Sequence, residues 1–239
     1  MLAFLTILCI ALVSVTAPAN VTSPDKRVLI ADGNGVRNGG LPDWNFRYRA
    51  SGYVAKGCPP GTWISICYEY RLSSDPTKNL DKDSKNQVVQ RDLFYSSSKP
   101  ADGKVREYTF RMKIDPSVAS APQSDSLPLV GLETRVFNVG DAVTTIYLDA
   151  RDNTLGIYNR ADRFTSLVHV PLADVVGKRI YQRWTHKSGP DGWTSIQVLD
   201  EDTQAVFLSY LAAGQYSWES YRMRVGTTRY VSNGMPPVK

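Results

Sequence analysis

Short segments in which apolar and polar residues alternate recur through most of the chain. They are rich in Val, Ile, Tyr, Thr and Phe, and clusters of Gly, Pro, Asn and Asp separate them. Alternation with a period of two is typical of β-strands that bury one face, and no segment has the period of a long amphipathic helix. Eleven strands are predicted, at 63–70, 88–95, 105–114, 129–138, 144–148, 154–158, 165–170, 180–186, 193–199, 205–210 and 221–230.

This pattern predicts an all-β fold, namely a two-sheet antiparallel β-sandwich of the jelly-roll type. RDNT at 151–154 and SGPDG at 188–192 are hairpin-type turn sequences, which suits short connections between antiparallel strands. The length of 239 residues fits one domain with a sizeable core. We expect this single domain to span residues 20–239.

The first 19 residues are expected to be a signal peptide. MLAFLTILCIALVSV is an uncharged apolar run, and the following Ala17-Pro18-Ala19 has the small-x-small form that signal peptidase reads. A membrane anchor is the alternative, but the run is shorter than the ~20 residues that span a bilayer. We therefore expect a secreted, extracellular and monomeric protein with no membrane contact after cleavage.

Export would leave Cys58 and Cys67 as the cysteines of the mature chain. An even pair in an oxidising compartment predicts a disulfide that closes the loop CPPGTWISIC. Two cysteines and two distant histidines do not form a ligand cluster, so no metal site is expected. His186 precedes a turn and is expected to face solvent, whereas His169 lies among apolar residues and is expected to be a hydrogen-bonded structural histidine.

The formal net charge of +5 favours a polyanionic partner such as an acidic polysaccharide. Nucleic acid is not expected, because the lysines are scattered and not interleaved with aromatic residues. The last predicted strand, YRMRVGTTRY, concentrates this charge. Its alternation places Arg222, Arg224, Gly226, Thr228 and Tyr230 on one face.

The order of segments in the second half resembles a known family. REYTFRMKID, LVGLETRVFN, TTIYLDARDNTLGIY, VGKRIYQRWTHKSGPDGWTSIQVLD and YRMRVGTTRY follow one another as in the concanavalin-A-like jelly roll of polysaccharide lyases, notably glucuronan and alginate lyases. The resemblance covers roughly residues 88–230. It implies cleavage of a polyuronate by β-elimination and leaves calcium open as a cofactor.

The late strand of the alginate lyases has the pattern Tyr-x-Lys-x-Gly-x-Tyr. With Gly226 placed on its glycine, Arg224 stands at the lysine and preserves its charge. Thr228 stands where the resemblance would require the acid/base tyrosine, but Tyr230 lies on the same face one step further along the strand. The resemblance therefore implies a basic face more strongly than a complete catalytic set.

A polyuronate lyase removes the proton at C5 while a cationic side chain pairs with the neighbouring carboxylate. Arginine suits this pairing because its planar fork binds a carboxylate in two places. The candidate catalytic residues are Tyr230 as acid and base, with Tyr95 and His169 as substitutes, and Arg224 and Arg135 as carboxylate partners. The candidate substrate-binding residues are Arg222, Glu133, Gln90, Arg91 and Tyr95.

Two other functions remain open. A non-catalytic, lectin-like protein would use the same basic face to bind carbohydrate. A glycoside hydrolase based on Glu133 would need a second carboxylate flanking the scissile bond, and no paired pattern of this kind surrounds Glu133. A serine hydrolase is less favoured still, because the sequence Gly-x-Ser-x-Gly is absent.

Overall fold

The computed structural model describes residues 27–58, 62–82, 88–99, 102–119, 127–135, 143–159, 166–213 and 220–231. The predicted signal peptide lies outside these residues. Over the described ranges, no helix combines the length and the apolar character that crossing a bilayer requires.

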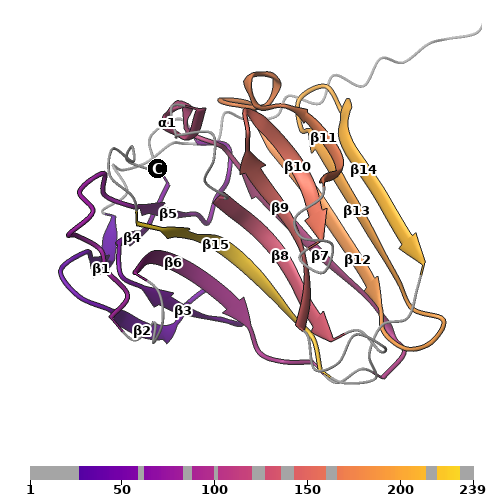
Figure 1. Cartoon of the computed structure of the whole chain (residues 1–239), viewed down its shortest axis with the longest axis horizontal. Coiled ribbons are helices and arrows are strands. Elements are labelled where there is room, and N and C mark those ends of the chain that lie inside the picture. The colour runs from indigo at the N-terminus through magenta and orange to yellow at the C-terminus, as the bar shows by residue number, and fades with distance from the viewer. Residues whose placement is uncertain are drawn as a thin grey trace, which may run out of the picture.

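The described residues form three antiparallel sheets (Figure 1). The largest has eight strands in the order β11-β10-β9-β8-β15-β6-β3-β2, the second has four in the order β14-β13-β12-β7, and the third has three in the order β1-β4-β5. The strands are β1 (Val28–Asp32), β2 (Arg37–Gly40), β3 (Phe46–Ala50), β4 (Tyr53–Lys56), β5 (Tyr68–Arg71), β6 (Val89–Ser96), β7 (Val105–Met112), β8 (Leu127–Arg135), β9 (Val143–Arg151), β10 (Thr154–Asn159), β11 (Ser166–Pro171), β12 (Ile180–Lys187), β13 (Trp193–Asp200), β14 (Val206–Ala213) and β15 (Arg222–Tyr230).

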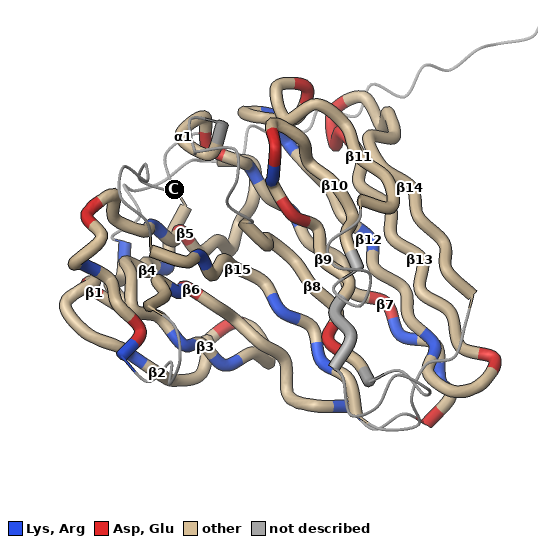
Figure 2. The backbone as a smooth tube through the Cα atoms, in the orientation of Figure 1, with Lys and Arg blue, Asp and Glu red and all other residues tan. Residues whose placement is uncertain are grey.

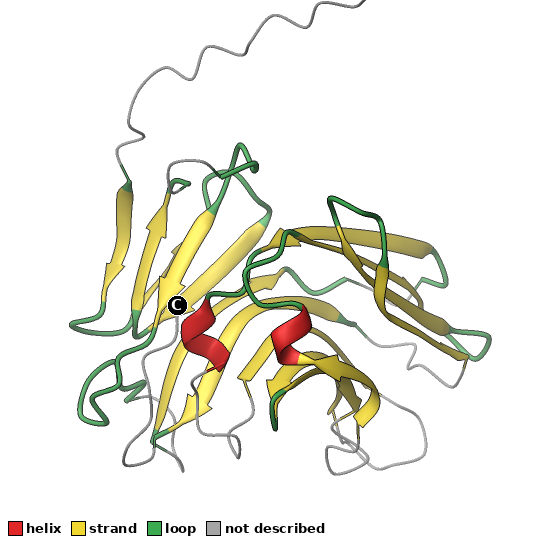
Figure 3. Ribbon diagram, turned by 90° about the horizontal axis from the view of Figure 1, so that it is seen from above, coloured by secondary structure: helices red, strands yellow, loops and turns green. Residues whose placement is uncertain are grey.

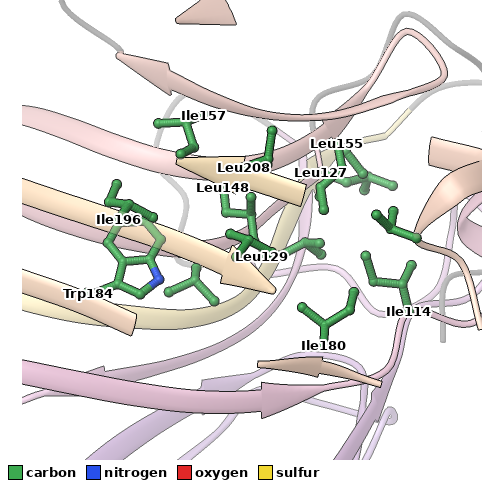
Figure 4. Close-up of a cluster of buried hydrophobic side chains, with 14 of the residues drawn as sticks. Ile114, Leu127, Leu129, Leu148, Leu155, Ile157, Ile180, Trp184, Ile196 and Leu208 are labelled. Carbon is green, nitrogen blue, oxygen red and sulfur yellow. The ribbon is translucent and has the colours of Figure 1, made fainter. Parts of the chain in front are cut away.

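The main core lies between the eight-stranded and the four-stranded sheets. Leu148 and Ile157 of the large sheet are fully buried together with Trp184 and Ile196 of the smaller one (Figure 4). Burial of side chains of this size contributes about 1.5–3 kcal/mol each to folding. The all-β sandwich predicted from alternation is therefore confirmed.

Two short helical turns close one part of this core. They are α1 (Pro116–Ala119) and the 3-10 turn η2 (Leu172–Asp174), drawn in red in Figure 3. Val118 and Leu172 carry buried side chains into the main core cluster. These turns follow β7 and β11, so they seal the core where those strands end.

Of the three-stranded sheet, the sequence predicted only β5, through the segment 63–70, and missed β1 and β4. Val54 of β4 belongs to a second apolar cluster with Ala50 of β3 and Phe94 of β6. Trp44 and Tyr68 pack against this cluster, with their ring centroids 4.8 Å apart. The three-stranded sheet therefore packs over β3 and β6 of the large sheet. It covers the face of the large sheet that, at its other strands, packs against the four-stranded sheet.

Strand β15 lies inside the large sheet, between β8 and β6 (Figure 1). Met223, Thr227 and Arg229 are buried on its inner face, whereas Arg222 and Arg224 are partly exposed on the other face. The alternation predicted for YRMRVGTTRY is thus confirmed. We call the face that carries Arg222 and Arg224 the outer face of the large sheet.

The predicted disulfide between Cys58 and Cys67 is present. It closes the loop between β4 and β5, and Trp63 of that loop donates its indole N–H to the carboxylate of Glu201. The guanidinium of Arg179 lies 5.2 Å from the Trp63 ring. The disulfide closes the loop, and Trp63 attaches it to Glu201 in the turn between β13 and β14.

Replacement of both cysteines by serine is expected to lower the free energy of unfolding by about 2–3 kcal/mol, because the bond closes a short loop in the unfolded chain. Urea denaturation followed by tryptophan fluorescence measures the change. The wild-type protein with added reductant should match the double variant. An unchanged midpoint would mean that the Trp63 contacts hold the loop without the bond.

Candidate functional site

One row of residues crosses the outer face perpendicular to the strands. Arg224 of β15 lies opposite Gly131 of β8 on one side and Tyr95 of β6 on the other. Gly131 in turn lies opposite Tyr147 of β9, and Tyr95 opposite Arg47 of β3. Residues opposite each other in neighbouring strands have adjacent side chains, so this row brings tyrosines and arginines together.

Glu133 binds Arg222 and Arg224, the two arginines that β15 carries on the outer face. Its Oε2 atom accepts hydrogen bonds from Nε of Arg222 at 2.6 Å and from Nε of Arg224 at 2.7 Å. The two arginine side chains are 38% and 29% exposed, while the carboxylate is mostly covered. We call Arg222, Glu133 and Arg224 the first triad. Its carboxylate holds the two guanidinium groups side by side and leaves one net positive charge.

The charge state of Glu133 follows from this contact. Burial by itself would raise the pKa of Glu133, but the hydrogen bond from Arg222 and the charges of both arginines outweigh burial and lower the pKa. The same hydrogen bond raises the pKa of Arg222. Glu133 is therefore an ionised carboxylate that orients arginines and not a proton donor.

Two tyrosine rings flank the first triad. The guanidinium of Arg222 lies 5.9 Å from the centroid of the Tyr95 ring. On the other side, a Cβ atom at Gly131 would meet the Tyr147 ring at 2.8 Å, so that ring covers the glycine backbone. The outer face thus presents guanidinium donors between two aromatic surfaces.

The structure does not bring Tyr230 to the first triad. Tyr230 ends β15, is 56% exposed and lies six residues beyond Arg224, which corresponds to about 20 Å along an extended strand. The two side chains therefore cannot act on neighbouring atoms of one sugar. Arg135 is the last residue of β8, opposite Val143, and its side chain is outside the described part of the structure.

Gln90 is buried on the inner face of the large sheet, whereas the side chain of the adjacent Arg91 lies on the outer face. Its amide donates to the backbone oxygens of Ser73 at 3.0 Å and Lys78 at 2.8 Å, and its oxygen accepts from Nε of Arg229 at 2.9 Å. Gln90 holds the loop after β5 against the sheet. It is not placed with the other predicted substrate-binding residues, because adjacent positions in a strand point to opposite faces.

Sequence reasoning missed Arg47 and Arg49. Both lie on the outer face, since they pair with Tyr95 and Leu93 of β6. Blue segments on β3, β6 and β15 run across neighbouring strands in Figure 2. A sequence signal existed, because FRYRA repeats the Arg-x-Arg spacing of YRMRV.

The two histidines are placed differently from the sequence expectation. His186 is buried, with Nδ1 at 2.9 Å from the Thr194 hydroxyl and Nε2 at 3.1 Å from the Ser188 hydroxyl, so the prediction that it faces solvent is wrong. The expected hydrogen bond of His169 is present, to the Ser166 hydroxyl at 3.2 Å, but its side chain is exposed. His169 stands on β11, four strands from β15 and so about 19 Å away.

Metal binding has no support in the described residues, where no three His, Cys, Asp or Glu side chains gather into a ligand group. Calcium, which the resemblance to lyases left open, stays a prediction without a site.

No family model matches the chain, and no curated protein matches it. Among solved structures, the chain is similar to a seed lectin of Lotus tetragonolobus, with a TM-score of 0.48 and 11% identity over 84% of this chain and 93% of that one. It is also similar to arcelin-5, a lectin-like defence protein from Phaseolus vulgaris, with a TM-score of 0.37 and 7% identity over 83% of this chain and 98% of that one. The first of these structures is described as a lectin and the second as a lectin-like protein.

Proposed function

We propose that the protein binds carbohydrate on the outer face of the large sheet, as a lectin-like protein without a required catalytic step. The observation that carries this proposal is the first triad between the rings of Tyr95 and Tyr147. Guanidinium groups donate hydrogen bonds to hydroxyl and carboxylate oxygens, and tyrosine rings offer apolar faces on which a sugar ring can stack.

The charge of the face favours an acidic sugar. In the first triad two arginines share one carboxylate. Arg47 lies nearby on β3, in a row of residues that contains no acidic side chain. A uronate carboxylate would face an excess of positive charge and donors already arranged side by side. Because Glu133 fixes both guanidinium groups before the ligand arrives, less side-chain freedom is lost on binding.

A polysaccharide lyase is the second candidate, and one contact favours it. Tyr95 lies directly opposite Arg224 in the β6–β15 pairing, so a tyrosine and a carboxylate-binding arginine stand side by side. A lyase on this face would use Tyr95 as its base, in place of the more distant Tyr230. A hydrolase based on Glu133 is not favoured, since a glycosidase acid needs a raised pKa and that of Glu133 is lowered.

Replacement of Arg224 by glutamine is expected to weaken binding of polyglucuronate at least about tenfold, because a hydrogen bond between charged groups contributes about 1.5–3 kcal/mol. Isothermal titration calorimetry on the whole chain measures the affinity. Arg183→Gln is the matched control, since Arg183 lies half-exposed on β12 of the other sheet. Equal affinities of the wild type and the Arg224 variant would overturn the proposed site.

The same preparations separate binding from elimination. A lyase produces an unsaturated sugar and therefore new ultraviolet absorbance in a mixture with polyglucuronate. Tyr95→Phe keeps the aromatic ring and removes the hydroxyl, so it should leave binding unchanged and abolish any such absorbance. Binding by the wild type with no absorbance change is the result expected from a lectin-like protein.

A further inference from the structure

A second arrangement of the same kind lies elsewhere on the outer face. The carboxylate of Asp81 accepts hydrogen bonds from Arg49, through Nε at 2.9 Å and Nη2 at 2.5 Å, and contacts Nη1 of Arg91 at 3.0 Å. Asp81 is buried, whereas the side chains of Arg49 and Arg91 are 23% and 27% exposed. We call Arg49, Asp81 and Arg91 the second triad. Like the first, it consists of one covered carboxylate between two partly exposed arginines.

The backbone fixes the second triad in place. Strand β3 ends at Ala50, and beyond that point the chain around Asp81 takes its place beside β6. Leu80 bridges to Gln90, and the N–H of Asp81 donates to the carbonyl of Val89 at 2.8 Å. The carboxylate is thereby held on the same side of the sheet as the Arg91 guanidinium. The triad is part of the sheet and not a chance pairing of mobile surface side chains.

Both triads belong to one continuous face. Arg91 lies opposite Thr228, four residues along β15 from Arg224, which places the triads about 14 Å apart along the strands. Arg47 lies on β3 beside Tyr95 and adds a further positive charge to the face. The two triads and Arg47 contain five arginines and two carboxylates, an excess of three positive charges.

The Arg91 cation is incompletely compensated by the protein. Burial lowers the pKa of Arg91, the Asp81 carboxylate opposes that change, and the neighbouring charges of Arg49 and Arg224 reinforce it. Within the described ranges, Nε of Arg91 is a buried donor with no hydrogen-bond partner. A ligand anion beside Arg91 would supply the missing negative charge.

We infer that the second triad is a second anion-binding subsite, and that one acidic polysaccharide chain spans both triads. This inference rests on the proposed function and extends it from a single sugar to a segment of polymer. Tyr230 is exposed at the end of β15, opposite Val89 and near Arg91, and corresponds to Tyr95 of the first subsite. Each subsite then combines an arginine pair for a carboxylate with a tyrosine for a sugar ring.

Two subsites on one ligand make affinity depend on chain length. Once one uronate is bound at the first triad, a uronate further along the same chain meets the second triad at high effective concentration. A short oligomer reaches one triad only. Affinity should therefore rise with oligomer length up to the length that spans both triads, and then level off.

The test is calorimetric titration with size-fractionated glucuronate oligomers, from the disaccharide upward. For the wild type, a spanning oligomer is expected to bind at least about tenfold more tightly than the disaccharide. In Arg91→Gln, which retains the Arg49–Asp81 contact, that ratio should fall to about one. Tyr230→Ala is a second variant at an exposed position, and it should reduce the ratio without affecting folding, as circular dichroism would verify.

The outcomes separate this inference from the function on which it rests. No binding of any glucuronate oligomer by the wild type would overturn the proposed function. Binding that does not depend on length, or a ratio that persists in both Arg91→Gln and Tyr230→Ala, would overturn the second subsite and leave the first. A loss of the ratio in both variants supports the spanning mode.

Discussion

Replacement of Gly226 by alanine is expected to lower the free energy of unfolding by about 4 kcal/mol, from the combined cost of backbone strain and overpacking. Gly226 has a φ of +118°, a conformation that residues with a side chain rarely adopt. An added Cβ atom would also stand 2.1 Å from the backbone oxygen of Asp92, in the paired strand β6. That oxygen belongs to the sheet and cannot move aside as a flexible side chain would.

Gly177→Ala is the matched control for this prediction. Gly177 also has a positive φ, of +77°, but nothing lies within 4 Å of the position that its Cβ would occupy. This variant should lose only about 1 kcal/mol, the cost of the left-handed conformation. Chemical denaturation of the three proteins measures the difference. If both variants lost the same amount, the close approach of β15 and β6 would be refuted.

Acidification from pH 7 to pH 4 is expected to cost about 3 kcal/mol of stability through His186 alone. Burial, followed by the nearby charge of Arg106, lowers the pKa of His186 from 6.5 to about 4. The ring lies between the hydroxyls of Thr194 and Ser188, with the Tyr221 ring at 4.7 Å. None of these groups offers the negative charge that an imidazolium would need.

The sign of the effect follows from proton uptake. Above pH 6.5 the imidazole is neutral in the folded and the unfolded protein, and His186 makes no pH-dependent contribution. Between pH 6.5 and about 4 the unfolded chain binds a proton that the folded protein does not. The free energy of unfolding therefore decreases as the pH is lowered through this window. Below that window both states are protonated and the loss is complete.

Urea denaturation at several pH values tests the prediction in His186→Gln, whose amide still offers a donor and an acceptor. The variant is expected to be less stable at pH 7 but to lose about 3 kcal/mol less than the wild type on acidification. His169→Gln is the control, because His169 is exposed on the edge strand β11. An unchanged pH dependence in His186→Gln would mean that other groups cause the acid sensitivity.

Alternation predicted the later strands because each has one face in a core. All eleven predicted segments overlap observed strands, and the buried positions of YRMRVGTTRY were assigned to the correct face. Strands β1 to β4 were missed, and for β2 and β3 the reason is local. RNGG of β2 contains no residue that favours a strand, and FRYRA of β3 has arginines at two of its five positions.

The candidate site was only partly predictable, because register is decided by partners far apart in the sequence. Arg222 and Glu133 are 89 residues apart, and Arg49 and Asp81 are 32 residues apart on segments with no shared motif. By contrast, the period of two already separated Gln90 from Arg91. Their joint selection as substrate-binding residues neglected a constraint that the sequence contained.

The central position of β15 also constrains the order in which the chain can fold during synthesis. This strand is the last of the described strands, yet it separates β6 from β8 and supplies both arginines of the first triad. Until residues 222–230 leave the ribosome, β6 and β8 each have an unpaired edge, and such edges are prone to pair with other chains. Pairing over so long a separation is intrinsically slow. Within the described fold, the region that we propose binds the ligand is therefore among the last to form.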